Sequence, residues 1–226
     1  MTAKVTGVLL AGGRAKRMGG GDKGFLTLGG RPIMDHIVER ARPQVEALII
    51  NANGDPERFS DYGLPVVPDV IGDFAGPLAG VLTGMEWAAA NAPQCPWVAS
   101  FATDAPFVPL DLVPRLKAAI EDQGTDLACA ASGGWVHPVF GLWPVALAGE
   151  LRRAMVDEEM RTIKRWTDRY KVALVEFECD PFDPFFNINE AENIAEAETL
   201  LTRLADTSAG DNPCDASPPP AAASPS

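Results

Sequence analysis

Short runs of apolar residues recur along the chain and predict the strands of a buried sheet. The residues within a run do not alternate with polar ones, as expected of strands that are covered on both faces of a parallel sheet. The predicted strands comprise residues 8–10, 47–51, 97–102, 126–131 and 172–177. A further short strand at 64–68 contains two prolines, which confine it to an edge of the sheet.

Segments with apolar residues at helical spacing separate these runs and predict helices. They span residues 33–43, 78–90, 110–122, 145–155, 162–170 and 191–204. The alternation of strands and helices indicates an α/β fold with a single doubly wound, mostly parallel sheet flanked by helices, as in Rossmann-like proteins. We assign this fold to one domain, residues 1–204. Residues 205–226 are rich in Pro, Ala and Ser and show no apolar periodicity, which predicts a disordered tail.

The first predicted strand runs into a loop that is rich in glycine and in cationic side chains. Residues 8–24 hold six glycines and four Lys or Arg residues against one acid, Asp22. Glycine lets the backbone approach a ligand, and successive free N–H groups bind anions. The stretch is not a P-loop, because Asp22 precedes Lys23 and Gly24 follows it. It predicts a loop that wraps a polyphosphate, since a plain surface loop gives no reason to gather four cations in an acidic protein.

Polar residues follow other predicted strands at their carboxyl ends, where open α/β sheets bind ligands. Asn51 ends one strand, although the Asn-Gly sequence just after it equally favours a simple turn. Asp104 follows the strand at 97–102, where a carboxylate next to phosphate suggests Mg²⁺. The alternative for Asp104 is an N-cap or an Asx-turn. Residues 72–80 form a second glycine loop that either makes a turn or contacts a base or sugar.

Two asparagines near the last helix are further candidates for ligand binding. Asn187 and Asn189 are separated by one residue, so they point the same way from an extended segment and could offer their amides to a substrate. Asn189 is also a suitable N-cap for the acidic helix that follows. His137 lies beside an apolar strand, a position more typical of a structural histidine, and we assign it no catalytic role.

Composition excludes several classes of protein. The net charge of −12 argues against a broad nucleic-acid footprint. The four cysteines are widely spaced, which favours free thiols in a reducing compartment, and two histidines make a His/Cys zinc site implausible. We find no signal-peptide pattern and no run approaching the ~18 apolar residues of a membrane span. We therefore expect a cytoplasmic protein that binds neither nucleic acid nor membrane.

The motifs resemble those of the molybdenum cofactor guanylyltransferase family, over roughly residues 5–204. The glycine loop carries Leu-Ala-Gly-Gly at 10–13, Arg-Met-Gly-Gly at 17–20 and Asp-Lys at 22–23. Gly21 stands where the family tolerates larger residues, and we expect it to add flexibility without changing the chemistry. Three later stretches are also usual in the family: Gly-Pro-Leu-Ala-Gly at 76–80, His-Pro-Val-Phe-Gly-Leu-Trp at 137–143 and Phe-x-Asn-x-Asn at 185–189.

This resemblance implies a reaction and its substrates. GMP would pass from Mg²⁺-bound GTP to the terminal phosphate of molybdenum-molybdopterin, giving the guanine dinucleotide cofactor and pyrophosphate. The implied partners are GTP, the molybdenum-molybdopterin acceptor, other proteins of cofactor biosynthesis and apo-molybdoenzymes. We expect the protein to act as a monomer with Mg²⁺ as its cofactor.

The resemblance also implies a role for each motif residue. Three residues are implied in catalysis: Arg17, which would steady the leaving pyrophosphate, Lys23, which would bind phosphate, and Asp104, which would hold Mg²⁺. Asn187 and Asn189 would bind the acceptor. The residues implied in GTP binding are Leu10, Ala11, Gly12, Gly13, Lys23, Asn51, Asp69, Gly76, Gly80 and Asp104.

Other activities remain open at this point. The closest alternative is a cytidylyltransferase that acts on the same acceptor, and a sugar-1-phosphate nucleotidyltransferase would fit the glycine loop equally well. A non-catalytic nucleotide-binding factor that loads cofactor into apo-enzymes belongs to another class. Lys23 and Asp104 argue against that factor, because a binding protein needs neither a leaving-group clamp nor a metal carboxylate.

Overall fold

A computed structural model describes residues 4–12, 25–72, 76–188 and 191–210. Seven strands form the main sheet in the order β5-β4-β1-β6-β8-β7-β9, and β2 pairs with β3 in a separate two-stranded sheet. Every pairing in the main sheet is parallel except those of β8 with its two neighbours. The expected doubly wound, mostly parallel sheet is confirmed. The strands are β1 (Val5–Leu10), β2 (Thr27–Leu28), β3 (Arg31–Pro32), β4 (Ala47–Asn51), β5 (Val66–Val67), β6 (Trp97–Ala102), β7 (Leu127–Ser132), β8 (Trp135–Pro144) and β9 (Val172–Phe177).

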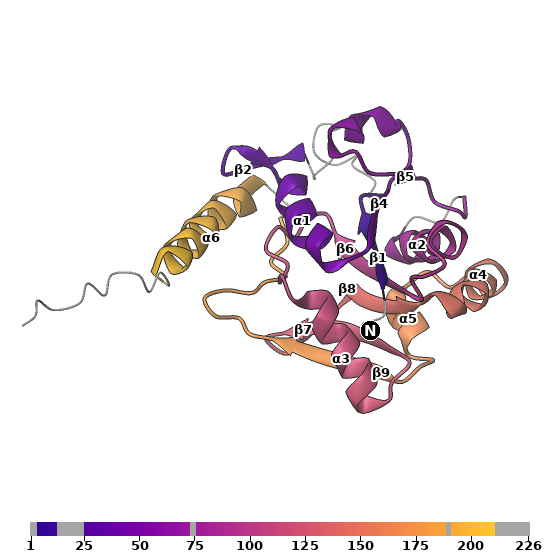
Figure 1. The fold of residues 1–226 in the computed structure, drawn as a ribbon. Helices are drawn as coiled ribbons and strands as arrows, with labels where there is room; N and C mark the ends of the chain where they lie inside the picture. Colours follow the sequence, from indigo (N-terminus) through magenta and orange to yellow (C-terminus); the bar gives the residue numbers. More distant parts are fainter. Residues whose placement is uncertain (1–3, 13–24, 73–75, 189–190, 211–226) are drawn as a thin grey trace, which may run out of the picture.

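Helices cover both faces of this sheet (Figure 1). Buried side chains of α1, α3 and α6 pack in one hydrophobic cluster, and those of α2, α4 and α5 pack in the other. The α-helices are α1 (Ile33–Ala41), α2 (Pro77–Asn91), α3 (Leu112–Gln123), α4 (Ala148–Asp157), α5 (Ile163–Thr167) and α6 (Ala191–Gly210). The short 3₁₀ helices are η2 (Arg42–Gln44), η3 (Pro56–Tyr62) and η4 (Val145–Leu147). None of the helices described is long and apolar enough to cross a membrane.

Strand β1 carries buried apolar side chains on both of its faces. Val5 and Leu9 belong to the cluster on one face of the sheet, and Val8 belongs to the cluster on the other. Both faces of the strand are therefore withdrawn from water, which explains the apolar run at residues 8–10, although Thr6 of this strand is also fully buried. The prediction of a buried central strand from this run is confirmed.

Two helix predictions were wrong in length. The helix expected at 162–170 is confined to α5, where the Thr162 hydroxyl accepts a hydrogen bond from the Arg165 N–H and so caps the first turn. The last helix runs past the expected end at Leu204 to Gly210. Helix boundaries are weakly encoded, because the terminal residues make few of the contacts that produce the apolar periodicity.

A two-residue turn reverses the chain between β7 and β8. Gly133 and Gly134 occupy it with φ values of 53° and 82°, the positive values that a type I′ hairpin turn requires at both central positions. The β7–β8 register then shifts between Cys129 and Ala130, so the strands are not continuously paired. The buried hydroxyl of Ser100 in β6 compensates for the irregularity, because it donates to the Val139 carbonyl of β8 and accepts from the Trp143 indole N–H at 2.9 Å.

Replacing Ser100 tests whether this hydroxyl holds β8 against β6. Ser100→Ala leaves the buried Trp143 N–H and the Val139 carbonyl without this partner, which should lower the free energy of unfolding by about 1–3 kcal/mol. Urea unfolding followed by tryptophan fluorescence measures the loss. Ser60→Ala, at an exposed serine of η3, is the matched control and should stay within about 0.5 kcal/mol of wild type. Equal midpoints for all three proteins would contradict the assignment.

Candidate active site

The carboxyl ends of three parallel strands meet at one edge of the sheet. In the register of the sheet, Leu10 at the end of β1 is paired with Asn51 of β4 on one side and with Ala102 of β6 on the other. The chain leaves β1 toward β4 and later returns to pair β6 on the opposite side, so the winding direction changes at β1. Such switch points leave a crevice outside the strand ends, which is where open α/β sheets bind ligands.

The side chain of Asn51 is buried at this edge and fixed by hydrogen bonds. Its Nδ2 donates to the Val67 carbonyl at 3.2 Å and to Asp69 Oδ1 at 2.9 Å. These bonds reach across to the end of β5 and to the segment after it instead of closing a local turn, so the turn interpretation of Asn51 is wrong. With both N–H groups engaged on that side, the amide presents its carbonyl oxygen in the opposite direction.

Two predicted glycines lie on the carbonyl side of Asn51. A Cβ atom on Gly80 would lie 2.3 Å from Asn51 Oδ1 and 2.5 Å from a methyl group of Leu10, and one on Gly12 would lie 3.5 Å from the same oxygen. Gly80 belongs to the first turns of α2, and Gly12 follows β1. Gly12, Asn51 and Gly80 thus lie together, and glycine at position 80 is required for the amide to fit.

Asp69 is oriented by amides at both of its carboxylate oxygens. Asn51 donates to Oδ1, and Asn53 Nδ2 donates to Oδ2 at 2.7 Å. Asn53 Oδ1 also accepts the Asp69 backbone N–H at 2.9 Å, which closes a ring of two bonds between these residues. Sequence reasoning missed Asn53, although its spacing from Asn51 was a signal, because residues two apart in an extended segment point the same way.

The second glycine loop leads into α2 at the same edge. Gly76 has a φ of 153°, a conformation that side-chain-bearing residues rarely adopt, and Pro77 starts the helix. A Cβ atom on Gly76 would lie 3.6 Å from the backbone oxygen of Arg161, so the loop between α4 and α5 lies against the start of α2. Because Gly80 in the first turns of α2 lies against Asn51, the N-terminal part of this helix is close to that side chain.

Asp104 connects this region with the late asparagine motif. It is half-buried after β6, and Thr103 beside it donates its hydroxyl to the Leu10 carbonyl at 3.1 Å. The Asp104 carbonyl accepts the Ile188 N–H at 2.8 Å. Asn187, which is exposed, is therefore held close to Asp104 although the two are far apart in the sequence. The N-cap alternative for Asp104 is wrong, because the next helix begins only at Leu112.

Four of the predicted residues, Gly13, Arg17, Lys23 and Asn189, lie outside the described residues, and their roles stay predictions. The described residues contain no group of three or more His, Cys, Asp or Glu side chains that could hold a metal ion without a substrate. Among the described residues Asp104 would therefore act without a ready-made cluster of ligands, and phosphate oxygens and water are suitable further donors. This donor set suits Mg²⁺, which often binds through one or two carboxylates together with phosphate oxygens and water.

Comparison with known proteins identifies the relatives of this chain. Residues 7–172 match the family described as the MobA-like NTP transferase domain. The molybdenum cofactor guanylyltransferase of Bradyrhizobium sp. (strain ORS 278) is 55% identical over 199 residues, which cover 88% of this chain and 94% of the relative. The protein of the same name from Nitrobacter hamburgensis is 53% identical over 194 residues, covering 86% and 93% of the two chains.

A solved structure supports the same fold. The molybdopterin-guanine dinucleotide biosynthesis protein A of Archaeoglobus fulgidus superposes with a TM-score of 0.67, over 88% of this chain and 99% of that one. The sequences are 22% identical, so this similarity is evidence for a shared fold.

Alanine at position 80 tests the close approach of α2 to Asn51. The added methyl group of Gly80→Ala meets Asn51 Oδ1 and Leu10, and overpacking of this kind should destabilise the protein by about 1–3 kcal/mol. Gly149 is also helical but has nothing within 4 Å of its would-be Cβ, so Gly149→Ala should stabilise by roughly 0.5–1 kcal/mol. Chemical denaturation measures the change in the free energy of unfolding for both variants. A stabilised Gly80→Ala protein would refute the packing described for Asn51.

Proposed function

Because this chain belongs to the MobA-like NTP transferase family, we propose that it transfers GMP from GTP to the terminal phosphate of molybdenum-molybdopterin. The chain is a nucleotidyltransferase with the fold of that superfamily. In the proposed reaction an oxygen of the acceptor phosphate attacks the α-phosphorus of GTP. The bond from that phosphorus to the bridging oxygen breaks, and pyrophosphate leaves. The observation that carries the proposal is the juxtaposition of two half-sites, one around Asn51 and one around Asn187, on either side of β1 and β6.

The half-site around Asn51 suits guanosine. The Asp69 carboxylate is held by Asn51 and Asn53, and each carboxylate oxygen can still accept a second hydrogen bond. Guanine presents two neighbouring N–H donors on one edge, whereas the corresponding edge of cytosine carries one donor and two acceptors. An oriented carboxylate therefore favours guanine. Gly80 supports this arrangement, because it lets α2 pack against the Asn51 amide that orients Asp69.

The triphosphate would lie over the ends of β1 and β6. We assign its binding to the backbone of residues 10–13 and to Lys23, with Arg17 steadying the pyrophosphate as it leaves. Gly12, within residues 10–13, lies beside Asn51. Phosphates bound by the backbone of residues 10–13 would therefore adjoin the guanosine half-site. Charge neutralisation by fixed cations and N–H groups, together with alignment of the two substrates, would supply the catalysis without a covalent intermediate.

Asp104 is the residue that would hold a metal ion. It follows β6 at the same edge, and its side chain and the substrate phosphates together make the oxygen donor set that Mg²⁺ prefers. When bound, the ion neutralises charge on the phosphates during transfer. Asp104 also fixes the acceptor side through its backbone, since its carbonyl accepts the Ile188 N–H. The amides of Asn187 and Asn189 would then face the pterin.

Base choice is the most direct test of the proposal. Pyrophosphate release should depend on both GTP and molybdenum-molybdopterin, and CTP should give no release above the background measured without acceptor. The guanine dinucleotide product, identified by mass spectrometry, confirms where the GMP has gone. Equal or faster release with CTP would assign the protein to the cytidylyl branch, and nucleotide binding without release would favour a loading factor.

Asp104→Asn tests the metal carboxylate. The change keeps the shape of the side chain but removes its charge, and a loss of several kcal/mol of transition-state stabilisation slows GMP transfer by about a thousandfold. Rates measured over a Mg²⁺ titration should show the loss at every metal concentration. Asp122→Asn, at an exposed aspartate of α3, is the matched control and should keep the wild-type rate. Near-normal turnover of Asp104→Asn at ordinary Mg²⁺ would exclude Asp104 as the main metal ligand.

A further inference from the structure

A polar cluster of Ser132, His137 and Asp183 lies within the acceptor half of the sheet, and the reaction proposed above gives it no role. Ser132 ends β7 and is fully buried. Its hydroxyl donates to Asp183 Oδ1 at 2.8 Å, and His137 Nε2 lies 2.7 Å from the same hydroxyl oxygen. Because a hydroxyl has one hydrogen and Asp183 receives it, the bond from His137 requires an N–H at Nε2. The three side chains thus form one directed chain, from His137 through Ser132 to Asp183.

The protonation of His137 agrees with this direction. Burial lowers the pKa of His137, while the nearby carboxylates of Asp183 and Glu176 act to raise it. The net effect is a pKa below the ordinary value, so the ring is mostly neutral at pH 7 and carries a single hydrogen. The bond to Ser132 Oγ assigns that hydrogen to Nε2.

Asp183 in turn shapes the loop that joins β9 to α6. Its Oδ1 also accepts the Phe185 N–H at 2.9 Å, and its carbonyl accepts the Phe186 N–H at 3.1 Å. The Phe185 ring is buried, with its centroid 4.7 Å from that of His137. It also packs 4.8 Å from the ring of Phe140. Ser132 and His137 therefore contact this loop at Asp183 and at Phe185, its first buried anchor.

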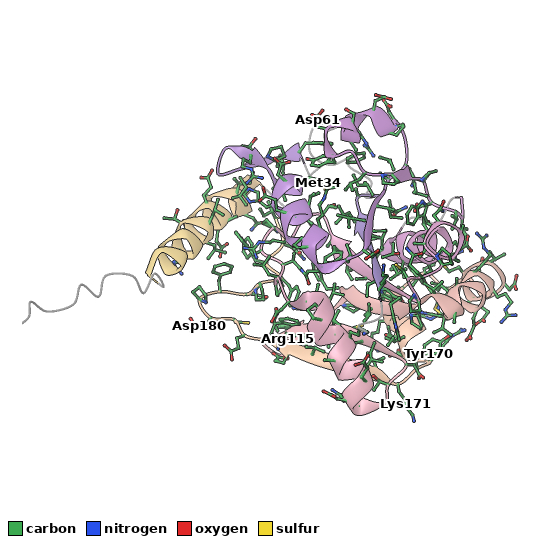
Figure 2. The ribbon with its side chains drawn as sticks, in the orientation of Figure 1. Met34, Asp61, Arg115, Tyr170, Lys171 and Asp180 are labelled. Carbon is green, nitrogen blue, oxygen red and sulfur yellow. The ribbon has the colours of Figure 1, made fainter. Side chains whose placement is uncertain are left out.

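The loop's second anchor lies at the active-site edge. Ile188 is fully buried, and its N–H is donated to the Asp104 carbonyl. Asn187 is exposed and lies between the anchors Phe185 and Ile188. A segment this short, held at both ends, leaves the Asn187 backbone few conformations. The loop is drawn between β9 and α6 in Figure 1, and Asp180 in its first part is labelled in Figure 2.

We infer that Ser132, His137 and Asp183 are positioning residues for the acceptor, which hold the Asn187 segment against Asp104. The inference rests on the proposed function, because it assigns the segment from 183 to 188 to acceptor binding. The cluster and the guanosine half-site are distinct, because the half-site around Asn51 is built on other strands. Loosening the cluster should therefore weaken binding of the acceptor and leave binding of GTP unchanged. General destabilisation of the protein would not affect one substrate alone.

Ser132→Ala tests this split. It removes the central hydroxyl without adding volume, and we expect the KM for molybdenum-molybdopterin to rise about tenfold with the KM for GTP unchanged. Tenfold corresponds to about 1.4 kcal/mol, the scale of one hydrogen bond to a charged group. Tyr170→Phe is the matched control, since it also deletes a hydroxyl donated to a carboxylate, that of Glu150. Tyr170 lies far from Asp180 in Figure 2, and this variant should keep both KM values.

Two variants of His137 provide the rescue test. His137→Gln keeps an N–H that can reach Ser132 and should retain most acceptor affinity, whereas His137→Leu removes it and should match Ser132→Ala. This pair of variants also tests the positioning role if Ser132→Ala does not fold. Equal acceptor KM values for Gln and Leu, or a parallel rise in both substrates' KM values, would overturn the inference.

A measurement without substrates separates this inference from the proposed function. Hydrogen–deuterium exchange should show faster exchange across residues 185–188 in Ser132→Ala than in wild type, and no change across residues 51–69. If the wild-type protein transfers no GMP, the proposed function fails, and the exchange data still test the cluster. Unchanged exchange at 185–188 would overturn the positioning role.

Discussion

The register of β1 with its two parallel neighbours is the constraint on which the rest of the structure depends. A shift of one residue would turn every side chain of the strand to the opposite face. Because β1 buries side chains on both faces, Leu10 is held level with Asn51 of β4 and Ala102 of β6. The segments that follow these three strands therefore begin at one edge, and each brings part of the site.

Close packing at this edge fixes the side chains of the candidate site. Gly80 allows α2 to approach until its backbone nearly touches the Asn51 amide, which a side chain at that position would prevent. The amide is then fixed by Val67 and Asp69, so it contributes a carbonyl oxygen with a set direction. A ligand bound by these side chains would cost little side-chain entropy, because folding has already ordered the Asn51 amide and the Asp69 carboxylate.

The far half of the sheet reaches the same edge by a different route. β8 is antiparallel to both neighbours, and its hairpin with β7 brings Ser132 and His137 next to each other. The loop after β9 then crosses back to β6, where Ile188 is bonded to Asp104. One backbone hydrogen bond thus links the half that we assign to the acceptor with Asp104, which follows β6 and which we propose as the metal carboxylate.

The sequence by itself determined the fold class and the central strands, and it pointed to the edge of the sheet where the candidate site lies. Apolar runs and glycine loops are local features, and in a doubly wound sheet the ends of parallel strands must share an edge, so Asn51, Asp104 and Gly80 could be grouped in advance. The partners of these residues could not be predicted. Asn51 bonds to residues 16 and 18 positions away, and Ser132 to one 51 positions away. Such pairs depend on which strands are neighbours and in what register, and nothing in the local sequence marks them. The spacing of Asn53 from Asn51 indicated a shared direction, but only the tertiary structure shows that Asn53 bonds to Asp69 and that His137 bonds to Ser132.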